Sequence, residues 1–176
     1  MNALRDAFEA ARLDPARIDP ALALAAARLE RGPDDPVISA YLGALHAMRA
    51  GAATLPWIKM RHANTAISLL DEAFERREGA GAAADWPADL EILLLRGIAY
   101  ANFPSFLGQA ATARRCLEAA RDHPAFAAVP QRYRALACAH LAVLCHRDQQ
   151  ADAARGHLER ALQADAPAAE PIWAAR

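Results

Sequence analysis

The chain has 176 residues, with 20 lysines and arginines against 21 aspartates and glutamates, and its mean hydropathy is -0.03. This length is typical of a single domain that buries its own core. The balanced charge argues against a general nucleic-acid binder and against a polyanionic tail. No stretch approaches the roughly 18 uncharged apolar residues that a membrane span needs. We therefore expect neither nucleic acid nor membrane as a partner.

The cellular compartment is predicted from the first residues and from the cysteines. The N-terminus reaches charged residues at Arg5 and Asp6 and lacks the apolar segment of a signal peptide, so we do not expect export. Cys116, Cys138 and Cys145 are an odd number, too few for a disulfide framework. We expect a protein of the bacterial cytoplasm.

The composition predicts an all-helical protein. About a quarter of the residues are alanine, the strongest helix former, and aromatic residues are only 6%. The basic residues are almost all arginine and are scattered singly, which indicates a GC-rich genome rather than a phosphate-binding surface. Aspartate followed by proline recurs, as at Asp35-Pro36, and is typical of helix starts. We expect helices near 2–13, 16–31, 36–50, 56–78, 87–102, 105–122, 130–147 and 150–164, with an internal loop near 78–85.

A repeated pattern supports pairing of these helices. Alanine, then leucine four residues later, then a small residue recurs on the second helix of each expected pair, at a period of about forty residues. Repeated helix pairs indicate an α-solenoid, in which each unit buries its apolar face against its neighbour. The four matches are Ala25/Leu29/Gly32, Ala66/Leu70/Ala73, Ala113/Leu117/Ala120 and Ala154/Leu158/Ala161.

Small residues in the first helices extend the same pattern. Leu42-Gly43, Arg96-Gly97 and Leu141-Ala142 each place a small residue where a partner helix can approach closely. With Gly97 followed by Tyr100, and with Pro124 closing the third match, the chain resembles the tetratricopeptide repeat family. The segment between Tyr100 and Ala113 is longer than the family pattern, and cysteines replace aromatics in the last unit.

The resemblance covers about three helix pairs, from near Pro36 to Pro167. With the helices before them, we expect one helical-repeat domain over residues 1–176, with about eight helices arranged as an α-solenoid or a compact superhelix. It comprises an N-terminal helix pair at 2–31, repeats at about 36–78, 87–124 and 130–167, and a short C-terminal tail.

A concave groove lined by the first helix of each pair follows from the same resemblance. Because its side chains are mainly apolar and small, we expect it to bind a partner helix or peptide rather than an acidic C-terminal peptide. A terminal segment of the chain, or a second copy, could also fill it. The groove positions are Val37, Ala40, Ala44, Ala47, Glu91, Leu94, Ile98, Asn102, Leu136, Ala139, Val143, His146 and Arg147.

Other candidate sites have structural interpretations. Cys138, His140, Cys145, His146 and His157 are metal-ligand types, but they lack the usual zinc spacings, and the cysteines fall at core positions. Tyr100, Phe103 and Phe106 form either a small core of their own or a partner contact, and Trp57 and Trp173 either cover a core edge or anchor a partner.

No motif for nucleophilic, phosphate-binding or metal-assisted catalysis occurs, so we expect no enzymatic activity, cofactor or metal. The sequence favours a non-catalytic protein-interaction module or scaffold that binds a protein or peptide, with homo-oligomerisation open. The alternatives are a chaperone for a client protein and a ligand-responsive or metal-responsive helical sensor.

Overall fold

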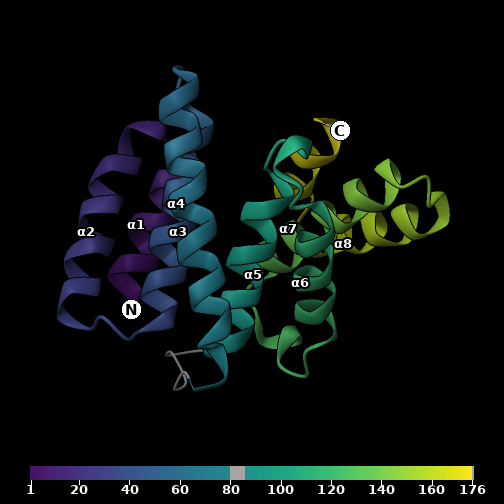
Figure 1. The fold of residues 1–176 in the computed structure, drawn as a ribbon. Coiled ribbons are helices and arrows are strands. Elements are labelled where there is room, and N and C mark those ends of the chain that lie inside the picture. Colours follow the sequence, from purple (N-terminus) through teal and green to yellow (C-terminus); the bar gives the residue numbers. More distant parts are fainter. Residues whose placement is uncertain (80–85, 176) are drawn as a thin grey trace. The chain divides into compact units, whose positions relative to one another are not determined.

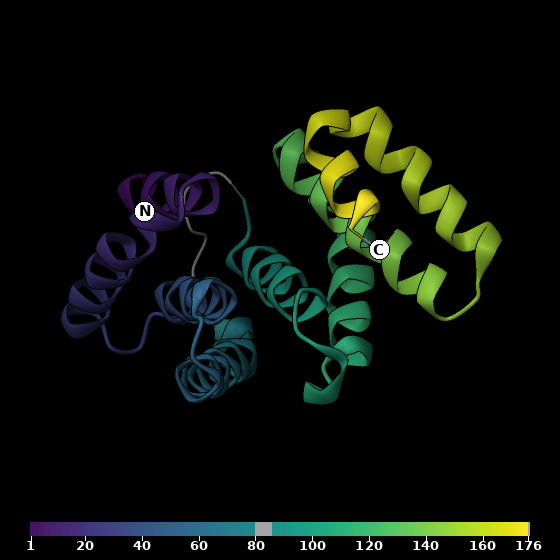
Figure 2. The same ribbon diagram turned by 90° about the horizontal axis from the view of Figure 1, so that it is seen from above.

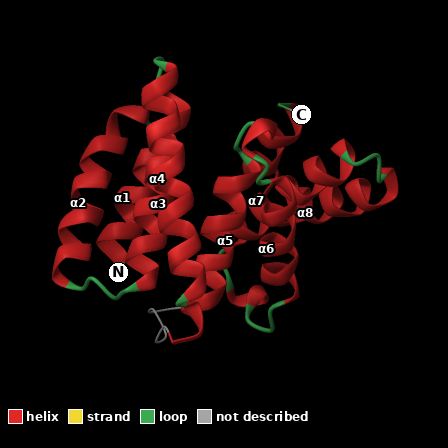
Figure 3. Cartoon of the chain, in the orientation of Figure 1, coloured by secondary structure: helices red, strands yellow, loops and turns green. Residues whose placement is uncertain are grey.

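The structure, a computed structural model, describes residues 1–79 and 86–175. Over these residues the chain forms eight α-helices and four short 3-10 turns, without a strand (Figure 3). The predicted all-α class is confirmed. Within the described part of the chain, no helix is both long enough and apolar enough to cross a membrane.

The helices follow the predicted order closely. Most of the predicted loop at 78–85 lies outside the described residues. The α-helices are α1 (Asn2–Leu13), α2 (Ile18–Arg31), α3 (Pro36–Ala52), α4 (Pro56–Glu75), α5 (Ala88–Ala101), α6 (Ala110–Asp122), α7 (Gln131–Arg147) and α8 (Ala151–Ala174). The 3-10 turns are η1 (Pro15–Arg17), η2 (Arg77–Gly79), η3 (Ser105–Leu107) and η4 (Phe126–Ala128).

Aspartate and proline start α3 as the sequence predicts. The Asp35 side chain accepts hydrogen bonds from the backbone N–H groups of Val37 and Ile38, at 2.9 and 3.2 Å. Pro36 occupies the first turn, where its missing N–H would have no partner in any case. Asp14 acts in the same way before η1, accepting from the N–H of Ala16 at 2.9 Å.

The C-terminal segment was expected to be a short tail after a helix near 150–164, and it is helical as far as Ala174. α8 is two helical segments separated at Asp165, whose φ of -163° and ψ of 93° are extended. The Asp165 side chain accepts a hydrogen bond from the N–H of Ala168 at 3.2 Å, and Pro167 lies in the first turn of the new segment. Asp165 thus ends one helical segment and caps the next.

Two compact units make up the chain, Met1–Arg96 and Gly97–Arg176. In the first unit α3 packs along α4, and α1 and α2 pack beside them (Figures 1 and 2). Leu4, Phe8 and Ala11 bury the apolar face of α1, and the Phe8 ring meets the Tyr41 ring edge to face, with centroids 5.1 Å apart. The short N-terminal helix is therefore held by tertiary packing.

A buried ion pair joins α1 to α5. The Arg5 guanidinium donates to both carboxylate oxygens of Glu91, at 2.8 and 2.7 Å, and the Tyr41 hydroxyl donates to the same carboxylate. Glu91 is only 1% exposed. The hydrogen bonds to Glu91 raise the pKa of Arg5. Glu91, which the resemblance placed in a binding groove, instead connects three helices of the first unit.

Two histidines form a second polar contact in the first unit. The Nδ1 atoms of His46 on α3 and His62 on α4 are 2.9 Å apart, a hydrogen-bonding distance. Both rings are half-buried. Burial lowers the pKa of both side chains. For His62, the positive charges of Arg61 and Arg49 lower the pKa further.

In the second unit α7 packs along α8 and also contacts α6. The alanines of the repeated pattern lie in the interior of both units, as do Leu70 and Leu117, while Leu29 and Leu158 are half-buried. The interior is built largely of small side chains, which allow the helix backbones to approach one another. The fully buried members are Ala25, Ala66, Leu70, Ala73, Ala113, Leu117, Ala120 and Ala161.

Candidate functional site: an arginine-lined cavity

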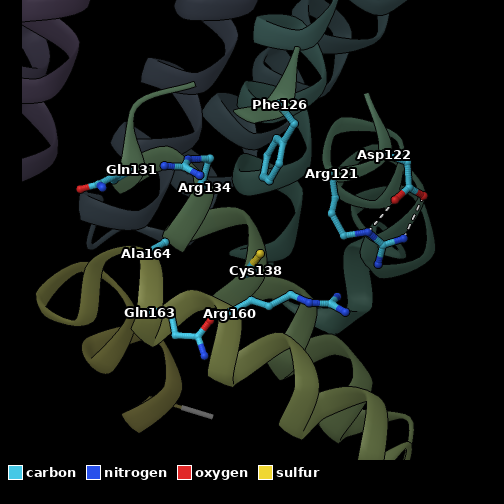
Figure 4. Close-up of a pocket in the computed structure, with 9 residues that line it drawn as sticks. All are labelled: Arg121, Asp122, Phe126, Gln131, Arg134, Cys138, Arg160, Gln163 and Ala164. Carbon is cyan, nitrogen blue, oxygen red and sulfur yellow. Dashed lines mark hydrogen bonds and ion pairs between the residues drawn. The ribbon is translucent and has the colours of Figure 1, made fainter. Parts of the chain in front are cut away.

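An open cavity of about 860 Å³ lies in the second unit. Its wall combines the end of α6, the η4 turn, the first turns of α7 and the middle of α8 (Figure 4). This size is within the range of ligand-binding pockets. The lining residues are Arg121, Asp122, Phe126, Gln131, Arg134, Cys138, Arg160, Gln163 and Ala164.

One of the three arginines carries its own counter-charge. Arg121, in the last turn of α6, donates from Nε and a terminal nitrogen to the two carboxylate oxygens of Asp122, at 2.8 and 2.9 Å. These hydrogen bonds hold the pKa of Asp122 below its ordinary value and raise that of Arg121. Asp122 is therefore ionised at neutral pH, and a paired carboxylate of this kind is a poor general acid or base.

The other two arginines have no ion-pair partner among the residues that the structure describes. The Nε atom of Arg134 is buried and forms no hydrogen bond. Arg160 is exposed on α8, and its positive charge also lowers the pKa of Asp122. A buried donor without a partner is unfavourable in the free protein, and an acceptor bound in the cavity would satisfy it only after the Arg134 side chain turned toward that space.

Cys138 forms the floor of the cavity. Its side chain is only 4% exposed, and burial raises the pKa of its thiol although Arg160, Arg121 and Arg134 act in the opposite direction. All three guanidinium groups are thus close enough to influence this sulfur. A thiol that stays protonated at neutral pH is a poor nucleophile.

The charged groups lie on opposite sides of an apolar centre. In Figure 4 the side chains of Arg121 and Arg160 extend to one side of the Cys138 sulfur, and those of Arg134 and Gln131 lie on the other. The Phe126 ring faces the same central space. The cavity therefore has an apolar middle and positively charged ends.

The groove positions that the resemblance implied are mostly buried in the chain. Ala47 and Ile98 are half-buried, and only Asn102, His146 and Arg147 are exposed. A partner could reach the buried positions only if a helix moved, and the groove stays a prediction. The buried positions are Val37, Ala40, Ala44, Glu91, Leu94, Leu136, Ala139 and Val143.

The candidate metal ligands are not gathered into one site. Over residues 1–79 and 86–175 no three cysteine, histidine or acidic side chains form a group that could hold a metal ion. All three cysteines are free and buried, as their core positions predict. His140 is buried with its Nε2 atom 3.4 Å from the Asn102 amide nitrogen, and burial lowers the pKa of its imidazole to about 4.

The aromatic candidates divide between core and surface. Tyr100 is buried and stacks on Phe103 with ring centroids 5.6 Å apart, which agrees with a small core in the long turn. Phe106 is 73% exposed and Trp57 is 68% exposed. Trp173 lies against the His146 ring, with centroids 5.5 Å apart, so it covers part of α7.

Sequence reasoning missed the cavity because its arginines are far apart along the chain. They look isolated in the sequence, and only the packing of α6, α7 and α8 places them around one space. A signal was present: Arg121 follows and Arg160 precedes the last alanine of a repeated motif, next to Ala120 and Ala161. Residues adjacent to a buried helical stripe lie at its edge, where clefts between helices open.

Comparisons with protein-family models, with curated proteins and with solved structures find no match.

Proposed function

We propose that this chain is a tetratricopeptide-like helical-repeat protein that acts without catalysis, binding a segment of a partner protein in the cavity of its second unit. The proposal rests on one observation: a ligand-sized cavity that combines an apolar wall at Phe126 with two arginines that have no ion-pair partner among the described residues, Arg134 and Arg160. Such a combination is typical of a site that recognises a ligand.

The protonation states of Asp122 and Cys138 favour a binding role for the cavity over a catalytic one. Asp122 is ionised and paired with Arg121, and Cys138 is protonated at neutral pH. Catalysis by a nucleophile needs an activated group with a base beside it. Neither side chain meets that requirement, whereas both suit a site whose charge is fixed before the ligand arrives.

The helical pairing supports the repeat architecture. In both units a glycine or small residue of one helix faces the Ala-x-x-x-Leu motif of the next, as a helix-pair repeat requires. Repeat proteins of this kind use extended surfaces between stacked helices for binding. A protein segment is accordingly the ligand that we propose.

The test compares two phenylalanines in similar 3-10 turns. Phe126→Ser removes the apolar wall of the cavity, whereas Phe106→Ser changes an exposed ring outside it. The tagged wild-type protein and both variants are used to capture proteins from the native host, with quantitative mass spectrometry. We expect one set of proteins to depend on Phe126 and to be captured normally by Phe106→Ser. Equal capture by all three proteins, or loss with Phe106→Ser alone, would overturn the assignment of the cavity as the binding site.

A further inference from the structure

The cavity has more positive charge than its own residues neutralise. Three arginines and one aspartate line it, and the Cys138 thiol carries no charge at neutral pH. The one aspartate is paired with Arg121, which leaves Arg134 and Arg160 without a counter-charge among the described residues. Since these charges gather around one space, their combined field attracts negative charge more strongly than scattered surface arginines would.

The hydrogen-bonding state of Arg134 points in the same direction. Its Nε–H group is buried and lacks an acceptor. A guanidinium group donates best to a carboxylate or phosphate, because its fork of N–H groups matches two oxygens of such an anion. An anionic ligand would satisfy this donor once the Arg134 side chain turned toward the cavity that it lines.

The arrangement of the charges favours an extended ligand over a compact one. Arg160 and Arg121 lie to one side of the Cys138 sulfur and Arg134 to the other (Figure 4). A single phosphate group would meet one end of the cavity and leave the other end unpaired. An extended chain with negative charge at two places, and an apolar group between them, meets both ends and the centre. Gln131 and Gln163 add amide groups that can pair with a peptide backbone.

We propose that the segment bound in this cavity is acidic, with carboxylate side chains on both sides of an apolar residue that packs on Phe126. This inference rests on the proposed function, because it specifies the chemistry of the partner segment. The sequence alone led to a different expectation, in which a mainly apolar groove disfavours an acidic C-terminal peptide. The arginines that change this expectation lie on α6, α7 and α8 and outside the implied groove positions.

An unbiased peptide selection tests the chemistry of the ligand. A library of random short peptides displayed on phage is selected against the whole 176-residue chain, and the enriched peptides are synthesised with acetylated and amidated ends. Their affinities are measured by fluorescence anisotropy at low and high salt. We expect enriched peptides in which acidic residues flank an apolar one, with affinity that falls as salt rises.

Matched variants then locate the contact. Arg134→Gln and Arg160→Gln each remove one positive charge from the cavity, and we expect about a tenfold loss of affinity from each. Arg155→Gln removes an exposed arginine from the same helix as Arg160, outside the cavity, and serves as the control. Circular dichroism and melting temperature check that each variant folds. For a folded Arg160→Glu variant, we expect tighter binding of a peptide in which lysine replaces one acidic residue.

The outcomes separate this inference from the proposed function. One outcome is that the enriched peptides are neutral or basic and that their binding depends on Phe126 but not on the arginines. That result would overturn the acidic chemistry of the ligand and would keep the cavity as a binding site. Enriched acidic peptides whose affinity falls equally with Arg155→Gln would show surface attraction only and would overturn the inference. Failure of any peptide to depend on Phe126, Arg134 or Arg160 would overturn both proposals.

Discussion

Gly43 on α3 lies so close to Leu70 on α4 that a Cβ atom added to the glycine would be 2.8 Å from the leucine Cγ. The same relationship recurs in the second unit, where a Cβ on Gly97 would be 2.7 Å from Cγ and Cδ2 of Leu117. Both leucines belong to the repeated motif. Glycine is used at these two positions because nothing larger fits between the paired helices.

We predict that Gly43→Ala destabilises the protein by about 1–3 kcal/mol, because the added methyl group overpacks the contact with Leu70 and also meets the backbone oxygen of Ala66 at 3.2 Å. Gly156→Ala is the control, because no atom lies within 4 Å of its added Cβ. There the better helix propensity of alanine should stabilise by up to about 1 kcal/mol. Urea denaturation measures both effects. Equal stabilisation by the two substitutions would show that the α3–α4 contact has room to relax.

We predict that Glu91→Gln destabilises the protein by about 3–5 kcal/mol, because it leaves the Arg5 guanidinium with an uncharged partner in a buried site. The control is Asp19→Asn, which removes the negative charge that pairs with Arg49. The Asp19 side chain is 69% exposed. An exposed pair of that kind contributes less than about 1 kcal/mol. Chemical denaturation of both variants gives the comparison, and equal effects would contradict the buried role of Glu91.

We predict that the protein loses stability as the pH falls from 6.5 to about 4. The pKa of buried His140 is lowered from 6.5 to about 4, so in this range the unfolded chain binds a proton that the folded chain does not. By linkage this difference is about 3 kcal/mol, and it stops growing below the folded pKa.

The pKa values of His46, His62 and His157 are also lowered, chiefly by burial, and add in the same direction. Denaturation at a series of pH values measures the slope. His140→Gln should flatten it more than His123→Gln, and an unchanged slope would show that another group controls acid sensitivity.

We predict that Cys138 reacts slowly with thiol reagents in the folded protein at neutral pH. Its side chain is 4% exposed and burial raises its pKa, so little thiolate is present. A variant with Cys116→Ala and Cys145→Ala isolates the reaction of Cys138, and the rate in denaturant provides the reference. Labelling as fast as in the unfolded chain would show that the cavity floor is open to solvent and reagents.

Local signals predicted the helices well, because capping and periodicity act over a few residues. Asp35 caps α3 as expected, and the alanine and leucine motif marks the buried stripes of α4 and α6. The segment after Ala164 was the main difference, because the last helix was expected to end near residue 164, whereas Asp165 starts a new helical segment.

The candidate site was harder to predict because it depends on packing between helices. The side chains of Arg121, Arg134 and Arg160 are individually ordinary in sequence, and their common cavity exists only once three helices are in place. The burial of Glu91 was missed for the same reason. Its partner Arg5 lies in a helix that the resemblance did not include.

The alanine-rich interior limits which substitutions this fold can accept. An alanine side chain has no rotamers to lose, so folding restricts few side-chain torsions at these positions. At buried sites such as Ala66, Ala113 and Ala161, however, every natural substitution except glycine is larger. Variation can enter such an interior only through paired changes on facing helices, so we expect sequence drift to concentrate on the outer faces, including the rim of the cavity.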